Sequence, residues 1–312
     1  VASFNYQYVD YAKYLEACPG LIVYQSEATS SELTAPFFGM DQDKMVGLAY
    51  WGAIEYWGES NGWPKKGWNY SFFNHALEPY PQAYLIKSAF SDEPLVHIGV
   101  VDSKKESIEW NDVTVGRMPL SSHWNRPEGS KQNLFTYTNA DEVELLVNGK
   151  SFGIQKNKRD DIQSRNMIYW KDIPYGKGGN ILAIARNNGK EVARHLLETT
   201  GKAKALKIEL ENADWKADGM DLQYVKVYAV DGKGRVVPAA EGEVTFEVSG
   251  EARLIAVDNG DHMTDELFSG NHKKLHQGFV MAILRSSQTG GDVKVKASLK
   301  GLKSAEKKMM TK

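Results

Sequence analysis

Residues 21–31 have the sequence LIVYQSEATSS, in which an apolar run ends on a carboxylate, Glu27, among small hydroxyl residues. The first four residues have the character of a buried strand. In an α/β barrel each parallel strand is apolar along its length and delivers its last residues to the carboxyl-end face, where active sites lie. The stretch therefore predicts a barrel strand with Glu27 at the position of a catalytic group. The competing interpretation is a solvated carboxylate at the end of an ordinary strand.

The sequence on either side of this stretch alternates helical and strand patterns. The amphipathic run DYAKYLEAC is stopped by Pro19-Gly20, and YPQAYLIKSAF is also helical in pattern. Between them, Val46 to Trp57 is predicted as a second buried strand. This β/α alternation predicts one domain over residues 1–92.

From about residue 93 the apolar runs become short and rich in β-branched residues, which is typical of β-sandwiches. Asn148-Gly149 separates two alternating runs and predicts a hairpin turn. A small polar segment, residues 199–205, precedes a second region of the same pattern. We therefore expect a mainly β chain, with immunoglobulin-like sandwiches over residues 93–201 and 204–312.

Composition limits the classes of partner. The 312 residues carry a net charge of −2 and a pI near 6.4. These values do not indicate the basic surface that binds nucleic acid. No apolar run approaches the roughly 18 residues that span a bilayer. The single cysteine, Cys18, excludes an intrachain disulfide framework and a multi-cysteine metal site. These features favour an uncharged partner and predict no nucleic-acid or membrane partner and no cofactor.

Aromatic residues and carboxylates accompany Glu27 on the next strand. The end of this strand and the residues after it carry Trp51, Glu55, Trp57, Glu59 and Trp63, which we expect near the same rim. A sugar packs its C–H faces on aromatic rings while its hydroxyls need acceptors, so this combination suits a carbohydrate. The alternatives are that the tryptophans are core residues and that Glu55 and Glu59 are structural or solvated.

Two other patterns were weighed as metal sites. His272 and His276 have a helical spacing in HKKLH, but the glutamate of a zinc-protease motif is absent and two histidines are too few ligands. Residues 258–266, DNGDHMTDE, are rich in oxygen ligands for calcium around Asp258 and Asp261, yet they lack the twelve-residue loop pattern. Asn259-Gly260 is more simply a tight turn, and no metal site is predicted, although the sequence leaves open whether calcium binds near Asp258 and Asp261.

Four segments resemble, in order and spacing, the last part of the catalytic barrel of family-two glycoside hydrolases, the β-galactosidase group. They are NYQYVDY, LIVYQSEATSS, VGLAYWGAIEYWGES and PYPQAYLIKSAF. Later segments resemble the two β-sandwich domains that follow the barrel in long members: SSHWNRPEG, FTYTNADEVELLVNGKSFG, DGMDLQYVKVYAVDGKGRVVP and IAVDNGD. The resemblance covers nearly the whole chain.

The resemblance implies a retaining, double-displacement mechanism on β-linked glycosides. The family nucleophile ends the seventh barrel strand and falls on Glu27, and a family tyrosine that hydrogen-bonds the nucleophile falls on Tyr6. The alternative for Tyr6 is a core or barrel-lining residue. Trp51 matches the tryptophan that floors the sugar subsite. The acid/base glutamate of the fourth strand has no counterpart here, because that strand would lie upstream of Val1. The family run TGFDYLGEP is GAIEYWGES here, so Glu55 replaces an aspartate and Ser60 a proline.

The chain is therefore expected to be the carboxyl-terminal fragment of such a hydrolase, inactive without the amino-terminal domains of its own chain. By resemblance, the location is periplasmic or extracellular rather than cytoplasmic. The sequence leaves open the choice among galactoside, glucuronide and mannoside, and whether the protein forms homo-oligomers. The alternative from another class is a non-catalytic module whose sandwiches bind carbohydrate or brace an interface.

Overall fold

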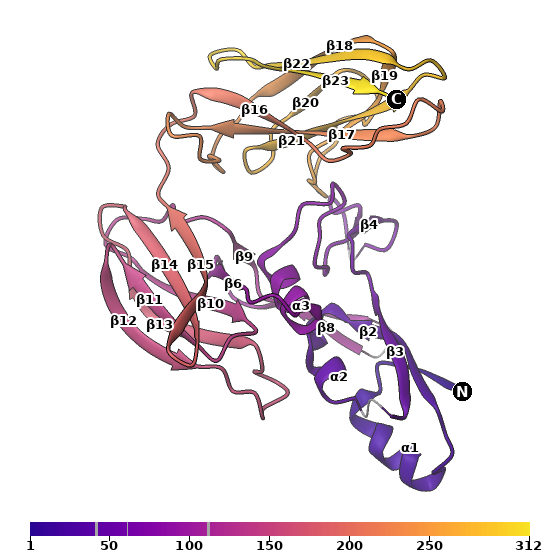
Figure 1. The fold of residues 1–312 in the computed structure, drawn as a ribbon, viewed down its shortest axis with the longest axis vertical. Helices are drawn as coiled ribbons and strands as arrows, with labels where there is room; N and C mark the ends of the chain where they lie inside the picture. The colour runs from indigo at the N-terminus through magenta and orange to yellow at the C-terminus, as the bar shows by residue number, and fades with distance from the viewer. Residues whose placement is uncertain (41–42, 61, 111–112) are drawn as a thin grey trace. The chain divides into compact units, whose positions relative to one another are not determined.

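The computed structural model describes residues 1–40, 43–60, 62–110 and 113–312. The chain divides into two compact units, residues 1–199 and 200–312 (Figure 1). Strands dominate both units, so the prediction of a mainly β fold is confirmed. No helix within the described ranges has the length and apolar character needed to cross a membrane.

The first part of unit 1 is built on three parallel strands in the order β1-β2-β3. Its elements are β1 Ala2–Asn5, α1 Tyr11–Ala17, β2 Val23–Thr29, α2 Ala35–Phe38, β3 Met45–Trp51, β4 Tyr56–Trp57, β5 Gly67–Trp68 and α3 Pro81–Phe90. Because the strands are parallel, their carboxyl ends meet at one edge of the sheet. The register places Asn5 beside Glu27 and Thr29 beside Trp51 at that edge.

Helix α1 covers this sheet with one face. Tyr11 is buried and clusters with Val23 of β2 and Met45 of β3. The helix ends where the Cys18 N–H bonds the Tyr14 carbonyl, immediately before Pro19-Gly20. Proline and glycine after a helix stop its continuation, so the sequence prediction of this helix end is confirmed.

The second predicted strand is shorter than expected. It was expected to run from Val46 to Trp57, but β3 ends at Trp51. Gly52 then adopts φ +67°, a left-handed conformation that breaks the strand. A Cβ at Gly52 would lie 2.6 Å from Trp68 Nε1, so a side chain there would also collide with the Trp68 ring. The chain after Gly52 consequently takes a new direction and carries Glu55 and Trp57 with it.

The rest of unit 1 is a two-sheet antiparallel sandwich with an additional hairpin, β7–β8. Its strands are β6 Val96–Val101, β7 Glu106–Trp110, β8 Val113–Arg117, β9 Leu120–Ser121, β10 Lys131–Thr138, β11 Glu142–Val147, β12 Lys150–Lys156, β13 Met167–Pro174, β14 Asn180–Asn187 and β15 Lys190–Glu198. The sheets have the orders β13-β10-β6-β9 and β12-β11-β14-β15. Trp124 and Trp170 are buried in the core between them. The predicted hairpin at Asn148-Gly149 is confirmed, with both residues at positive φ.

The expected boundary between residues 92 and 93 lies inside unit 1. Helix α3 packs on β6 and β10 of the sandwich. Asn166, in the loop before β13, donates through Nδ2 to the carbonyl and hydroxyl oxygens of Ser88 on α3, both at 3.1 Å. Residues 1–92 and the first sandwich are therefore joined by a continuous packed interface.

Unit 2 is a second two-sheet antiparallel sandwich. Its strands are β16 Ala205–Leu210, β17 Leu222–Val230, β18 Glu243–Gly250, β19 Ala252–Asp258, β20 His272–Lys274, β21 Phe279–Ser286, β22 Gly291–Ser298 and β23 Ala305–Thr311. The sheets have the orders β16-β17-β21-β19 and β20-β18-β22-β23. Phe246 and Trp215 are buried in the core between them. A sandwich over this region is what the sequence predicts.

Candidate active site

Glu27 lies near the end of β2, at the edge where the three parallel strands finish. Its side chain is half-buried, whereas Gln25 two residues earlier on the strand is fully buried. Gln25 accepts a hydrogen bond of 2.6 Å from the Tyr11 hydroxyl and donates one of 3.2 Å to the Glu27 carbonyl. Buried amide contacts thus fix the backbone on which the carboxylate stands.

Tyr6 holds the Glu27 carboxylate through a short hydrogen bond. The Tyr6 hydroxyl donates to Oε2 of Glu27, and the Tyr6 N–H bonds the Glu27 carbonyl at 2.8 Å. Burial first, and then the bond to Glu27, raise the pKa of Tyr6 above its ordinary value, so the phenol stays protonated as a donor. Tyr6 has φ +58°, an unusual conformation for a non-glycine residue. The two residues expected to act together are therefore brought together.

The segment after β2 turns away through a capping box. The Thr29 N–H donates to the Glu32 carboxylate, and the Glu32 N–H donates to the Thr29 side chain. Both bonds lie at a short 3-10 turn over Ser30–Glu32. The sequence TSSE carries this signal, which our sequence analysis did not use. The turn leaves the Thr29 side chain at the same strand edge as Glu27.

A cavity of about 360 Å³ opens beside Glu27. Its described walls combine two carboxylates with three tryptophans and other polar and apolar groups: Asn5, Tyr6, Glu27, Thr29, Trp51, Glu59, Trp68, Trp110, Val113 and Val115. Trp51 is 39% exposed and meets Tyr56 edge to face, with ring centroids 6.3 Å apart. The predicted residues Tyr6, Glu27 and Trp51 share this cavity, whereas Glu55 and Trp57 are not among its walls.

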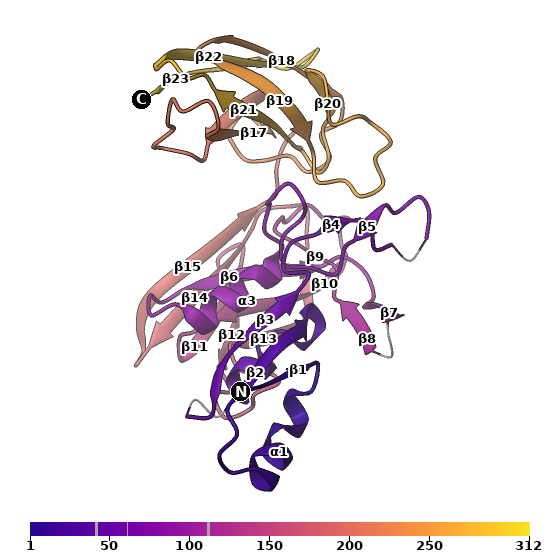
Figure 2. The ribbon, with the colours of Figure 1, turned by 90° about the vertical axis from the view of Figure 1, so that its right-hand side faces the viewer.

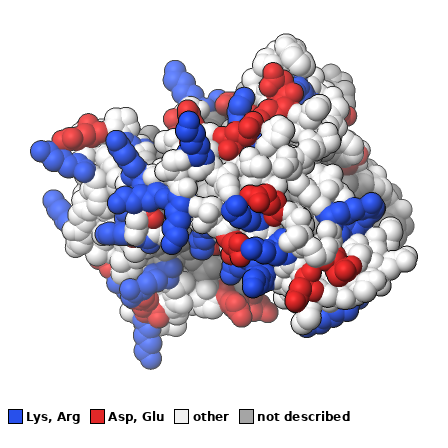
Figure 3. Space-filling model, turned by 90° about the horizontal axis from the view of Figure 1, so that it is seen from above, with Lys and Arg blue, Asp and Glu red and all other residues white. Residues whose placement is uncertain are grey.

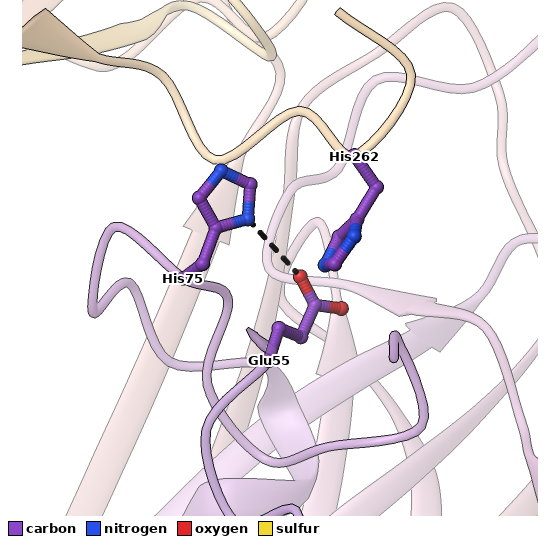
Figure 4. A group of neighbouring side chains, drawn as sticks. All are labelled: Glu55, His75 and His262. Atoms are coloured by element: carbon purple, nitrogen blue, oxygen red, sulfur yellow. Dashed lines mark ion pairs between the residues drawn. The ribbon is translucent and has the colours of Figure 1, made fainter. Parts of the chain in front are cut away.

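Glu55 lies in a buried charged cluster. It is 3% exposed and accepts a 2.9 Å hydrogen bond from the Tyr80 hydroxyl. Arg117 Nη1 lies 3.6 Å from its Oε1, and His75 Nδ1 lies 3.9 Å from its Oε2 (Figure 4). Such a network compensates the cost of burying a carboxylate. A structural role for Glu55 thus explains its contacts.

Trp57 and Glu59 follow Glu55 around the same loop. The Trp57 ring packs on the His75 ring with centroids 4.9 Å apart. Glu59 lines the cavity and accepts a hydrogen bond from the Tyr56 hydroxyl. The change of direction at Gly52 therefore places Glu59, rather than Glu55, beside the cavity.

The two segments weighed as metal sites have other structures. His272 lies at the start of strand β20, so the HKKLH run is not helical. In the loop after β19, the carboxylate of Asp258 accepts the N–H groups of Asn259 and Gly260, and Asp261 accepts that of Met263. These carboxylates are engaged in tight turns, as the turn interpretation of Asn259-Gly260 predicts.

Surface charges of both signs are interspersed on the face in Figure 3. On β22 of unit 2, Lys294 and Lys296 each pair at 2.8 Å with a carboxylate on a neighbouring strand, Glu306 and Glu247. Exposed pairs of this kind contribute little to stability, but they neutralise the lysines locally.

The part of the cavity wall that comes from β5 and the β7–β8 hairpin is not predicted from the sequence. Trp68 and Trp110 meet edge to face with centroids 5.5 Å apart. The alternating pattern of ESIEW and VTVGR predicts strands. Nothing in that local pattern shows that this hairpin packs on β5 and the residues around it instead of extending a sandwich sheet.

Comparisons with known proteins agree with the resemblance seen in the sequence. Residues 206–308 match the family model "Glycoside hydrolase family 2 C-terminal domain 5", and residues 129–193 match a domain of unknown function, DUF4982. The β-galactosidase BoGH2A of Bacteroides ovatus is 30% identical over 268 residues, which are 85% of this chain and 28% of that protein. A β-glucuronidase of Formosa agariphila is 28% identical over 229 residues, covering 72% of this chain and 20% of that protein.

Solved structures extend the same relation. A glycosyl hydrolase family 2 member from Bacteroides cellulosilyticus matches with a TM-score of 0.86 and 30% identity, over 100% of this chain and 42% of that one. The chain thus spans between a fifth and about two fifths of the length of these relatives. Together the matches show that it resembles the carboxyl-terminal part of family 2 glycoside hydrolases.

Proposed function

We propose that this chain, as the carboxyl-terminal part of a family 2 glycoside hydrolase, supplies the nucleophile of a retaining enzyme that acts on β-linked glycosides. One observation carries the proposal. Glu27 lies near the end of a parallel strand, accepts the Tyr6 hydroxyl and lines the same cavity as Trp51. An oriented carboxylate beside an aromatic face is what covalent catalysis on a sugar requires.

We infer different tasks for the two oxygens of Glu27. The Tyr6 hydroxyl occupies Oε2, so Oε1 attacks the anomeric carbon and forms the glycosyl–enzyme bond. The leaving-group oxygen takes its proton from a second carboxyl group as its bond to the sugar breaks. That group then removes a proton from a water molecule, whose oxygen attacks the anomeric carbon and releases the sugar from Glu27. We assign the second carboxyl group to the part of the hydrolase that precedes this chain.

The charges of the cavity favour a neutral sugar. Its described walls hold the carboxylates Glu27 and Glu59 and neither lysine nor arginine. A glucuronide would place its own carboxylate beside these groups, and like charges at close range are unfavourable. We therefore favour a β-galactoside-like substrate over a glucuronide.

Trapping the intermediate tests the proposal. The hydrolase that contains this chain is treated with 2-deoxy-2-fluoro-β-galactosyl and -glucuronyl fluorides, and the labelled peptide is identified by mass spectrometry. We expect the galactosyl label on Glu27, and we expect Glu27→Gln to lower turnover by orders of magnitude because covalent catalysis is removed. Glu16→Gln, an exposed change on α1, is the matched control. A label on another residue, or near-normal turnover of Glu27→Gln, would overturn the assignment.

A further inference from the structure

The β7–β8 hairpin leaves the sandwich to which it belongs in sequence. It connects β6 to β9, which pair with each other in one sandwich sheet, yet the hairpin forms a separate two-stranded ribbon (Figure 2). Cross-strand register pairs Ile108 with Val115 and Trp110 with Val113. Because side chains alternate along strands, these four apolar residues share one face of the ribbon.

The hairpin is anchored firmly to the loop that follows β3. Val115 is 2% exposed and clusters with the buried rings of Trp68 and Tyr70. Arg117 at its end donates to the Asn69 carbonyl at 2.9 Å, besides its ion pair with buried Glu55. A ribbon held by a buried core and a buried charge is a fixed wall rather than a loose loop.

The two faces of the hairpin differ in chemistry. Trp110, Val113 and Val115 line the cavity beside Glu27. The opposite face is polar and exposed, where the Thr114 hydroxyl bonds the Glu109 carboxylate at 2.7 Å. The apolar face is thus directed to the cavity in the described part of the ribbon, and it suits a flat, weakly polar surface such as a ring.

The position of this wall indicates which part of a substrate it meets. The sugar that reacts must lie against Glu27, whose neighbours in the cavity, Asn5, Thr29 and Trp51, come from the parallel strands and their ends. In a retaining mechanism the leaving group departs from the face opposite the nucleophile. The hairpin, which enters from outside the parallel sheet, is therefore placed to contact what extends beyond the reacting ring.

We propose that the β7–β8 hairpin forms the leaving-group side of the sugar site and that the Trp110 indole packs on a ring in the leaving group. This inference rests on the proposed function. It gives residues of the sandwich region a role in substrate selection. That role is not evident from the sequence, because these residues lie far from Glu27 along the chain. The favoured substrates carry a second sugar ring or an aromatic ring.

Two substrates with the same reacting sugar separate this role from a structural one. An aryl β-galactoside carries a ring as its leaving group, whereas β-galactosyl fluoride carries a single atom. In the hydrolase containing this chain, Trp110→Ala should lower kcat/KM for the aryl galactoside about tenfold and leave that for the fluoride within about twofold, as expected for one lost ring contact. The control is Trp63→Ala, because Trp63 is 80% exposed and is not among the cavity walls.

Acceptor sugars give a second measurement. The trapped 2-fluorogalactosyl enzyme is reactivated by water or, faster, by an acceptor that binds where the leaving group left. Trp110→Ala should leave reactivation by water unchanged and reduce the acceleration by a disaccharide acceptor. Trp110→Phe keeps a ring on Trp68 and should show smaller losses of the same kind, which allows a test if the alanine variant does not fold.

The outcomes distinguish the two proposals. Absence of galactoside hydrolysis by the wild type, or full activity of Glu27→Gln, overturns the proposed function and this inference with it. The hairpin assignment alone is overturned if wild-type activity depends on Glu27 but the Trp110 variants behave like the Trp63 control. It is also overturned if these variants lose kcat/KM equally for both substrates.

Discussion

Tyr6 and Glu27 are two residues of the cavity wall that are joined by one hydrogen bond, although they lie 21 positions apart in the sequence. The phenol is kept protonated by burial and by the adjacent carboxylate, so it remains a donor across the neutral range. The strand-end position of Glu27 was predictable from the apolar run before it. The contact with Tyr6 followed only from the family resemblance, because Tyr6 lies 21 residues away.

Removing the Tyr6 hydroxyl should slow formation of the glycosyl–enzyme. In Tyr6→Phe, Glu27 loses the donor that orients it, and a hydrogen bond to a charged group contributes about 1.5–3 kcal/mol, so we expect a roughly 10- to 100-fold loss. The rate of inactivation by the 2-fluoro sugar measures this step directly. Tyr14→Phe is the control, because the Tyr14 hydroxyl bonds Gln7 outside the cavity. If Tyr6→Phe reacts at the wild-type rate but unfolds more easily, Tyr6 is a packing residue.

Glu55 illustrates where sequence reasoning fails at the scale of elements. Its expected place on a strand ending at Trp57 was reasonable from apolar character alone, but a single glycine, Gly52, ends β3 early. Glu55 instead contacts Tyr80, at the start of α3, and Arg117, on β8. No local pattern relates these three elements. Strands and turns were predictable because periodicity and turn residues are local signals, whereas their docking depends on tertiary contacts.

The docking of α3 on the first sandwich includes a stack of three rings. Tyr84 of α3 lies on His97 of β6 with centroids 3.6 Å apart, and His97 lies 4.1 Å from His195 of β15. The Ile98 N–H bonds Nδ1 of His195 at 3.0 Å. Burial lowers the pKa of His195 to about 4, and burial together with repulsion from His195 lowers the pKa of His97 to about 2. The stack therefore requires neutral histidines.

Stability should consequently fall as the solution becomes acidic. Both folded-state pKa values lie below the unfolded value of about 6.5, so below that pH the unfolded chain binds more protons. The two groups contribute fully above pH 6.5. As the pH falls, the contribution of each is lost by roughly 1 kcal/mol per pH unit, down to about pH 4 for His195 and about pH 2 for His97. Urea unfolding of the chain at pH 7 and pH 5 measures the loss.

Substitutions identify the source of that pH dependence. His97→Phe with His195→Gln keeps a ring on Tyr84 and an acceptor for Ile98, and it should flatten the pH profile. His272→Gln on β20 is the control, since its side chain is exposed. An unchanged slope in the double variant would assign the acid sensitivity to other groups.

At the scale of the whole molecule, the two sandwiches and the parallel strands differ in completeness. Each sandwich has two four-stranded sheets closed over its own core. The parallel sheet has three strands, and in the described residues β1 and β3 each pair only with β2. An α/β barrel needs eight strands, each paired on both sides. This chain spans a fifth to about two fifths of the length of the relatives that it matches.

The 312-residue chain by itself should therefore show no β-galactosidase activity although Glu27 is present. A retaining hydrolase needs a proton donor for the leaving oxygen, and general acid catalysis contributes about 10²- to 10⁴-fold. The second carboxylate among the described cavity walls, Glu59, already accepts the Tyr56 hydroxyl. Open edges on the parallel sheet would also loosen the strand ends that position Glu27, and loss of positioning weakens catalysis further. The purified chain is assayed on an aryl β-galactoside beside the longer hydrolase, with Glu27→Gln of the chain as a control for contaminating activity. Turnover within about a hundredfold of the longer hydrolase, abolished by Glu27→Gln, would show that the chain carries its own acid, because the missing group normally supplies at least that factor.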